Sequence, residues 1–369
     1  MKKVMLIFGT RPEAIKMCPV VKEIAKHKDL QPLVCVTAQH REMLDQVLKL
    51  FQVVPDYDLN IMKAGQTLYD ITARVLTGLQ TVLQEAKPDL VLVHGDTTTT
   101  FAAALAAYYM QIPVGHVEAG LRTNNKYSPY PEEMNRRLTG SLCDWHFAPT
   151  ALARENLLKE NVNPESILVT GNTVIDALQM TVQKEFAFQD KDLQKVLQSG
   201  KRLLLMTTHR RENLGEPLRQ VYRALKEVLR SHEDVQVVFP VHKNPAVRKV
   251  VEAELAGMDR VLLTEPLDYE PFANLMSHAY LILTDSGGIQ EEAPSLGKPV
   301  LVVRDTTERP EAVAAGTVKL VGTDFDKVLT AMNNLLDDKS AYQKMAEAIN
   351  PYGDGLASER IVERIRRNA

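Results

Sequence analysis

Short apolar runs alternate with amphipathic stretches along nearly the whole chain. The first run, residues 4–8, has no polar position and stops at a glycine, which is typical of a strand buried on both faces of a parallel sheet. Similar runs, mostly apolar, recur at residues 33–37, 90–93, 114–117, 145–148, 167–170, 203–206, 235–240, 261–263, 281–284 and 300–303. Helical spacing of apolar positions fills intervals such as 12–27, 41–51, 67–86, 101–110, 218–231 and 358–367. The alternation predicts an α/β protein built on parallel sheets.

The alternation is interrupted once. Residues 183–201 are rich in charge and contain no clear strand, and the series starts again at residue 203. We interpret this stretch as an inter-domain region, so the chain is predicted to form two doubly wound α/β domains. A length of 369 residues agrees with this prediction, because one domain usually takes ~150 residues.

The composition argues against several classes of protein. Hydrophobic residues make up 45% and charged residues 25%, which is ordinary for a folded globular chain. Lys and Arg total 44 against 47 Asp and Glu, and a net charge of −3 argues against a general nucleic-acid binder. The cysteines Cys18, Cys35 and Cys143 are widely spaced, which argues against a disulfide framework or a structural zinc site.

No segment has the pattern of an export signal or a membrane span. The apolar run at residues 4–8 is too short for a signal peptide, and no stretch approaches the ~20 apolar residues that a membrane span needs. We therefore expect a cytoplasmic protein with no membrane partner.

Polar side chains follow many of the predicted strands. In open α/β sheets, ligands bind beyond the carboxyl ends of the strands, so these positions are candidates for chemistry. The strand ends carry Thr10-Arg11, Gly95-Asp96, Glu118, His209-Arg210-Arg211, His242-Lys243 and Asp285-Ser286-Gly287-Gly288. Clusters in both halves of the chain predict a ligand site served by two sheets.

Each candidate in the first half also has a plainer interpretation. Arg11 and Lys16 could hold an anion at a helix start, or they could be solvated surface charges. Asp96 opens a predicted helix and could be only its N-cap. Glu118 has no clear helix after it, so capping explains it less well. Glu132 could be an acid in a first helical turn that complements the helix dipole.

The second half offers a candidate phosphate loop. Adjacent glycines at 287 and 288 would let backbone amides approach a phosphate closely. Glu291 and Glu292 lie one turn further on, where a carboxylate could accept hydrogen bonds from ribose hydroxyls, or they could simply be acids in a first helical turn. Known cofactor and nucleophile motifs are missing, namely a GxGxxG after a strand, a Walker loop and a GxSxG elbow. The stretch Asp56-Tyr57-Asp58 resembles a metal-binding DxD, but it lies beside a proline in a predicted loop, and we expect no metal there.

The motifs taken together resemble one known family. The chain resembles the bacterial non-hydrolysing UDP-N-acetylglucosamine 2-epimerases, and the resemblance covers essentially its whole length. The matching stretches are residues 8–16, 94–98, 115–122, 129–136, 208–213, 285–294 and 304–311.

The resemblance implies a GT-B architecture, with two Rossmann-like doubly wound domains and a cleft between them. It places the N-terminal domain at residues 1–172, the UDP-binding domain at 173–355, and a C-terminal helix at 356–369 that returns to the first domain. It implies catalytic roles for Asp96, Glu118, Glu132 and His209. It implies substrate binding by Arg11, Lys16, Phe272, Ser286, Gly287, Gly288, Glu292 and Arg309.

The family reaction interconverts UDP-GlcNAc and UDP-ManNAc and supplies ManNAc for cell-envelope polysaccharide. The proton on carbon 2 is not activated by a carbonyl, and no dinucleotide fingerprint supports an oxidation route. Elimination of UDP to 2-acetamidoglucal, followed by re-addition, needs only cations for the diphosphate and acid/base groups near the ring. We therefore expect neither a nicotinamide nor a metal cofactor.

The resemblance also implies two properties outside the reaction. One is a homodimer. The other is activation by a second UDP-GlcNAc at Gln39, Arg210 and His242, although Glu42 and Gly65 depart from the Gln and Arg expected there. A hydrolysing epimerase, a GT-B glycosyltransferase or a non-catalytic nucleotide-sugar sensor remain the alternative functions.

Overall fold

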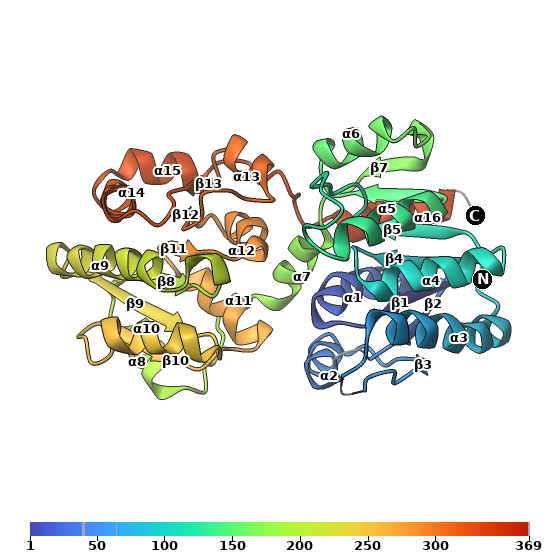
Figure 1. Cartoon of the computed structure of the whole chain (residues 1–369), viewed down its shortest axis with the longest axis horizontal. Helices are drawn as coiled ribbons and strands as arrows, with labels where there is room; N and C mark the ends of the chain where they lie inside the picture. Colours follow the sequence, from blue (N-terminus) through green and yellow to red (C-terminus); the bar gives the residue numbers. More distant parts are fainter. Residues whose placement is uncertain (39–40, 64, 368–369) are drawn as a thin grey trace. The chain divides into compact units, whose positions relative to one another are not determined.

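The computed structural model describes residues 1–38, 41–63 and 65–367 and divides the chain into two compact units (Figure 1). Unit 1 comprises Met1–Met180 and the chain from Tyr352 onward, and unit 2 comprises Thr181–Pro351. The resemblance placed this boundary between residues 172 and 173, at the start of α7 (Thr173–Thr181), the helix that leads out of unit 1. The terminal helix from Ala357 belongs to unit 1.

Unit 1 contains a sheet of parallel strands in the order β3-β2-β1-β4-β5-β6-β7. The order reverses between β1 and β4, so the carboxyl ends of these two strands flank a topological switch point, where ligands bind in open α/β sheets. The strands are β1 (Lys2–Phe8), β2 (Leu30–Val36), β3 (Tyr57–Asp58), β4 (Leu90–His94), β5 (Val114–Val117), β6 (Trp145–Ala148) and β7 (Ile167–Val169).

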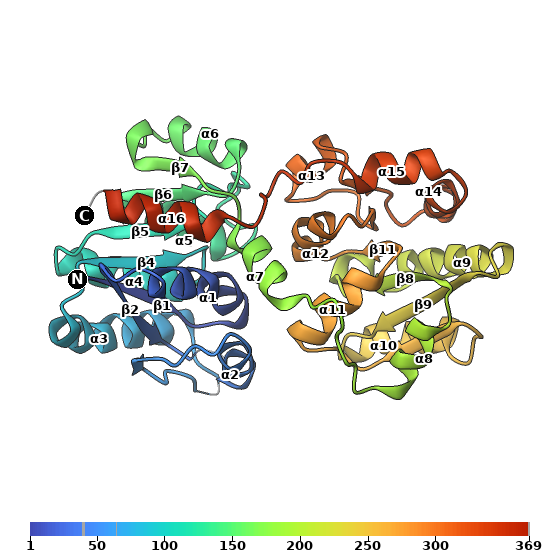
Figure 2. The same ribbon diagram turned by 180° about the vertical axis from the view of Figure 1, so that it is seen from behind.

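Helices cover both faces of this sheet. On one face α3 packs on α4 and α4 packs on α5, while α1 packs on α2 and on α16 on the other face, as Figures 1 and 2 show. Apolar side chains at helical spacing in α3 and the alanine-rich α4 bury one side of the sheet. The helices are α1 (Arg11–Ala25), α2 (Arg41–Leu50), α3 (Leu68–Ala86), α4 (Thr98–Tyr109), α5 (Glu132–Leu142), α6 (Ala151–Lys159), α7 (Thr173–Thr181) and α16 (Ala357–Arg367), with the short 3-10 turn η1 (Pro164–Ser166).

Unit 2 repeats the design with the strand order β10-β9-β8-β11-β12-β13, again parallel, and its switch point lies between β8 and β11. The strands are β8 (Arg202–Thr207), β9 (Val235–Pro240), β10 (Val261–Thr264), β11 (Leu281–Thr284), β12 (Val300–Val302) and β13 (Val318–Leu320). The helices are α8 (Lys191–Gln198), α9 (Glu216–Ser231), α10 (Pro245–Leu255), α11 (Tyr269–His278), α12 (Gly287–Glu292), α13 (Pro310–Ala314), α14 (Phe325–Asp337) and α15 (Lys339–Ala346), with 3-10 turns η2 (Arg211–Asn213) and η3 (Ala293–Leu296).

Three predictions about individual segments are corrected. Residues 57 and 58 form the short strand β3, where the pattern predicted only a loop, because two residues give no readable alternation. Strand β13 was not predicted, since its middle residue is an exposed lysine. The stretch 183–201 is not a linker, because it contains α8 and lies inside unit 2.

Two glycines allow the outgoing and returning chain segments to meet on unit 1. A Cβ atom at Gly171 would lie 3.2 Å from the Cα atom of Gly353, and both residues have positive φ. Beside them the backbone N–H of Asn172 donates to the carbonyl of Tyr352 at 2.7 Å. Across the described residues, no helix is both long and apolar enough to cross a membrane.

Candidate active site

The loop after β1 is tied to the start of α4 by one buried carboxylate. Glu13 accepts hydrogen bonds from the backbone of Gly9 and Thr10 at 3.1 and 2.8 Å, and from the hydroxyls of Thr97 and Thr100 at 2.7 and 3.2 Å. Burial raises the pKa of Glu13, and these hydrogen bonds oppose that effect. Both edges of the switch point are therefore fixed relative to each other.

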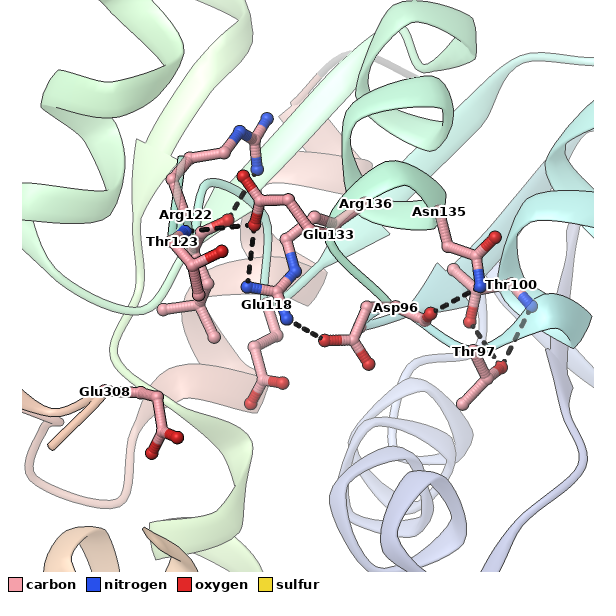
Figure 3. A network of polar contacts seen from close by, with 12 residues as sticks. Asp96, Thr97, Thr100, Glu118, Arg122, Thr123, Glu133, Asn135, Arg136 and Glu308 are labelled. Atoms are coloured by element: carbon pink, nitrogen blue, oxygen red, sulfur yellow. Dashed lines mark hydrogen bonds and ion pairs between the residues drawn. The ribbon is translucent and has the colours of Figure 1, made fainter. Parts of the chain in front are cut away.

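Arg136 of α5 holds Asp96 in place at the end of β4. Its guanidinium donates to Oδ2 of Asp96 at 2.5 Å and lies 3.4 Å from the buried carboxylate of Glu133, as Figure 3 shows. Thr97, not Asp96, is the N-cap of α4, because its hydroxyl accepts from the backbone N–H of Thr100. The capping interpretation of Asp96 is therefore wrong, and its partly exposed carboxylate has another partner.

Glu118 follows β5 in an uncommon backbone conformation. Its φ of 65° lies in the left-handed region, which non-glycine residues seldom adopt except where the surrounding structure imposes it. The carboxylate pairs with the ammonium group of Lys16 and accepts a hydrogen bond from Nδ2 of Asn172 at 2.8 Å. Nε2 of His94 lies 3.8 Å away. Residues from three separate segments thus converge on Glu118.

A row of buried histidines lies behind these carboxylates. Burial lowers the pKa of His94 to about 4 and that of His116 to about 3, and it lowers the pKa of His146 to about 4. His116 and His146 are register partners on β5 and β6, and Nε2 of His116 lies 2.7 Å from the carbonyl of Gly95. At neutral pH these rings are uncharged, so they add no positive charge beside Glu118.

Arg11 and Glu132 lie at the starts of helices α1 and α5. Each is half-buried, and neither side chain forms a hydrogen bond or ion pair within the described part of the chain. Glu133, the neighbour of Glu132, differs completely, because it is 0% exposed and accepts from the backbone of Thr123 and Asn124 at 3.0 and 3.1 Å. Adjacent acids in one helical turn therefore have different environments.

In unit 2, His209 follows β8 and faces the residue that follows β11. Asp285 is 0% exposed, and its Oδ2 accepts from the backbone N–H groups of His209 and Arg210, both at 2.9 Å. Its Oδ1 lies 3.0 Å from Nδ1 of His209. The ring of His242 stacks on that of His209 with the centroids 5.4 Å apart. Burial and the charge on His209 lower the pKa of His242.

The glycine loop after Ser286 lies beside a guanidinium. A Cβ atom at Gly287 would lie 4.0 Å from Nη2 of Arg309, and Arg309 is paired with the buried carboxylate of Glu291. A Cβ atom at Gly288 would lie 3.4 Å from Oε1 of Glu292. These contacts bring four of the predicted UDP-binding residues into one cluster.

Helix α11 adjoins the same cluster. Burial raises the pKa of Tyr269, and the nearby carboxylate of Glu292 raises it further. Phe272 lies one turn further along α11 and is half-buried. The second-half candidates therefore gather at the ends of β8 and β11, around the switch point of unit 2.

Three side chains that shape the site, Glu13, Arg136 and Asn172, had no role in the sequence-based prediction. Asp285 was named there only as part of a polar strand end, and Glu291 only as a possible acceptor for ribose hydroxyls. Their burial would have been the signal, but a single sequence does not show which acid in a motif faces inward. Gln39, predicted for the activator site, lies outside the described residues.

The DxD-like stretch has a structural explanation. Oδ2 of Asp56 accepts from the backbone N–H of Val34 at 2.7 Å, and Asp58 pairs with Arg41. Among the residues that the structure describes, no group of three or more His, Cys, Asp or Glu side chains is arranged to hold a metal ion.

Two Rossmann-like units with polar strand ends define a protein of the GT-B class. A solved structure titled as the glycotransferase of kitacinnamycin shares this fold with a TM-score of 0.65 at 11% identity, over 98% of both chains. The family model for UDP-N-acetylglucosamine 2-epimerase matches residues 22–366. The chain belongs to the UDP-N-acetylglucosamine 2-epimerase family, as its motifs predicted.

Individual relatives agree with this assignment. The UDP-N-acetylglucosamine 2-epimerase of Escherichia coli K12 is 57% identical over 372 residues, which cover 99% of both proteins. The Neisseria meningitidis UDP-GlcNAc 2-epimerase, solved with UDP-GlcNAc, is 53% identical with a TM-score of 0.87 over 99% of this chain and 100% of that one. A Staphylococcus aureus protein solved with UDP is 52% identical with a TM-score of 0.89, over 100% and 97%.

Proposed function

We propose that this chain interconverts UDP-GlcNAc and UDP-ManNAc. The observation that carries the proposal is the family membership, together with carboxylates and cations that converge at both switch points. The UDP-GlcNAc and UDP bound to the Neisseria and Staphylococcus relatives support the same class of substrate.

The reaction proceeds by elimination and re-addition. The bond between carbon 1 and the UDP oxygen breaks, carbon 2 loses its proton to a carboxylate, and 2-acetamidoglucal and UDP remain bound. UDP then adds back to carbon 1 while a carboxylic acid delivers a proton to the opposite face of carbon 2. No hydride leaves the substrate, so this route needs no nicotinamide, and cationic side chains such as Arg11, Lys16 and Arg309 would offset the diphosphate charge in place of a metal. We therefore expect full activity in EDTA without added NAD.

The residues divide this work between charge and proton transfer. Arg11, Lys16, Arg309 and His209 offset the charge that develops on the departing diphosphate, because preorganised cations stabilise such a leaving group. The other unit 2 residues, Phe272, Ser286, Gly287, Gly288 and Glu292, hold the nucleotide. Asp96, Glu118 and Glu132 exchange the proton at carbon 2. Asp96 and Glu118 are supported by their contacts with Arg136 and Lys16, which hold each carboxylate in one position.

One experiment separates this function from its alternatives. A proton NMR time course with UDP-GlcNAc in heavy water should show UDP-ManNAc with deuterium at carbon 2. Product without deuterium would contradict the elimination route. Free ManNAc with an equal amount of UDP would identify a hydrolysing enzyme, dependence on an acceptor sugar would identify a transferase, and an unchanged spectrum with measurable binding would identify a sensor.

The same proposal extends to regulation, assembly and cellular role. A second UDP-GlcNAc would act through Arg210 and His242, and a rate curve without sigmoidal character would contradict it. We also infer a cytoplasmic homodimer that supplies ManNAc for envelope polysaccharide. The exposed pair Tyr108 and Tyr109 at the end of α4 supports burial in an assembly, and light scattering that gives a 41.3 kDa species would refute the dimer.

A further inference from the structure

The buried acid Asp285 has no role in the reaction described so far. It directly follows β11 and is 0% exposed, whereas the neighbouring Ser286 and Gly287 are half-buried and Gly288 is exposed. A carboxylate removed from water is costly unless charged or hydrogen-bonding groups compensate it. Its partners should therefore show why an acid occupies this position.

The two oxygens of Asp285 face different partners. Oδ2 accepts from the backbone N–H groups of His209 and Arg210, which fixes the loop after β8. Oδ1 is buried, and no described donor forms a well-aligned hydrogen bond with it. The polar atom that faces it is Nδ1 of His209, 3.0 Å away. One oxygen thus holds the backbone, and the other is directed at the imidazole.

We propose that Asp285 is a positioning residue for His209: it fixes the ring with its proton on Nδ1 and leaves Nε2 for the substrate. The part of this proposal that concerns turnover rests on the proposed function, in which His209 acts on the departing UDP. The part that concerns the ring itself does not.

The proton position follows from the chemistry of the pair. An ionised carboxylate only accepts hydrogen bonds, so the ring nitrogen that faces it must carry a proton. Burial raises the pKa of Asp285, but the hydrogen bonds from His209 and from the backbone N–H of Arg210 outweigh this effect, and its pKa lies below the usual value. Asp285 is therefore ionised at neutral pH. The His209 side chain remains 37% exposed, so a ligand can approach its other side.

Other charged and titratable groups also lie around His209. The stacked ring of His242 comes from the end of β9 and disfavours a second positive charge. Arg210 is the next residue, and its Nε lies 3.4 Å from the backbone carbonyl of Asp285. Arg304 also faces Asp285, but its guanidinium is paired with Glu308 at 3.0 Å and lies close to a second acid. Asp285 is the carboxylate in direct contact with the ring.

Asp285→Asn separates the positioning role from a purely structural one. The variant keeps an oxygen for the two backbone N–H groups and turns an amide NH₂ toward Nδ1 of His209. Nδ1 must then accept a hydrogen bond, so the ring proton moves to Nε2. In the serine-protease triad the corresponding change leaves the geometry intact and lowers kcat about 10⁴-fold. Here we expect a loss of kcat of about 10²- to 10⁴-fold, the usual range for acid–base assistance.

The test uses the full-length chain labelled with ¹⁵N at histidine. Long-range proton–nitrogen spectra report which ring nitrogen carries the proton, and His209→Gln identifies the signals. The wild type should show the Nδ1–H form, and Asp285→Asn should show the Nε2–H form with lower kcat and a shifted pH profile. Asp176→Asn is the matched control, because buried Asp176 also accepts two backbone N–H groups, from Ser358 at 2.7 Å and Ala357 at 3.3 Å. It should lose stability without changing the His209 signals.

Three outcomes would overturn the proposal. The first is a wild-type ring protonated on Nε2, which needs no variant to observe. The second is an Asp285→Asn protein that retains the Nδ1–H form, and the third is one that keeps the wild-type pH profile and loses only stability, like the control. If the ring proton moves as expected but the wild type does not epimerise UDP-GlcNAc, the positioning role stands and the proposed function fails.

Discussion

Two adjacent acids at the start of α5 should respond in opposite ways to the same substitution. Glu133 is 0% exposed and accepts from two backbone N–H groups and from Nε of Arg137 at 3.1 Å, while Arg136 lies 3.4 Å from it. Burial raises its pKa, but the backbone hydrogen bond from Thr123 and the charge on Arg136 more than offset this, so its pKa is lowered. Glu132 has none of these partners within the described chain.

Glu133→Gln keeps the shape of the side chain but removes its charge and one accepting oxygen. Hydrogen bonds to a charged group contribute about 1.5–3 kcal/mol each, and one remaining oxygen still accepts, so we expect a loss of about 2–3 kcal/mol in the free energy of unfolding. For a unit of roughly 200 residues this corresponds to a fall in Tm of about 5–10 °C. Because Arg136 also holds Asp96, some loss of kcat should accompany it.

Glu132→Gln should do the reverse. Its stability should stay within ~0.5 kcal/mol of the wild type, as for most partly exposed positions, while kcat falls at least ~10²-fold. Circular dichroism melting curves and the NMR turnover assay measure both quantities on both variants. The reasoning is refuted if Glu133→Gln melts like the wild type, or if Glu132→Gln loses as much Tm as Glu133→Gln.

Three further predictions concern pH, the Glu118 contact and nucleotide binding. The buried histidines of unit 1 have pKa values below the 6.5 of an unfolded chain, so the unfolded state takes up protons first on acidification. The free energy of unfolding should therefore fall between about pH 6.5 and 4, by up to about 1.4 kcal/mol per pH unit for each ring. His116→Gln should make this fall less steep when the free energy is measured by urea unfolding at a series of pH values. Asn172→Ala removes the 2.8 Å hydrogen bond to Glu118 and should lower kcat about tenfold with little change in Kd for UDP; an unchanged kcat would show that the ion pair suffices. Glu291→Gln removes the negative charge that pairs with Arg309, so the guanidinium is held less firmly and UDP binding measured by calorimetry should weaken about tenfold. Tighter binding would instead mean that Glu291 competes with the phosphate for Arg309.

The layered fold was predictable because it rests on apolar periodicity. Buried runs such as residues 4–8 and 281–284 can form only the centre of a sheet covered on both faces, and they do. Strand β3 and the course of residues 183–201 were not predictable, because their placement depends on neighbours distant in sequence. Asp56, for example, is fixed by the backbone of Val34.

The positions of the candidate site could be predicted from the sequence, but the contacts between its residues could not. The positions after strands identified Asp96, Glu118 and His209, since strand ends are readable from the sequence. Which acid faces inward depends on helix phase and on the partner strand. Asp285 and Ser286 are neighbours in one motif, yet their environments are opposite. The supporting role of a residue such as Asp285 is therefore found only once a three-dimensional structure shows what each atom contacts.

The return of the chain to unit 1 at Tyr352 has a consequence for synthesis on the ribosome. Unit 2 is continuous in sequence, but unit 1 needs α16, which packs on α1. The buried residues of α16, Ile361, Val362 and Ile365, are synthesised only after all of unit 2. At about 5–20 residues per second, the 171 residues of unit 2 delay that helix by roughly 10–30 s. During this interval the face of α1 that α16 will cover remains exposed on the nascent chain. Unit 1 therefore begins to be synthesised before unit 2 but can complete its fold only after unit 2 has been made.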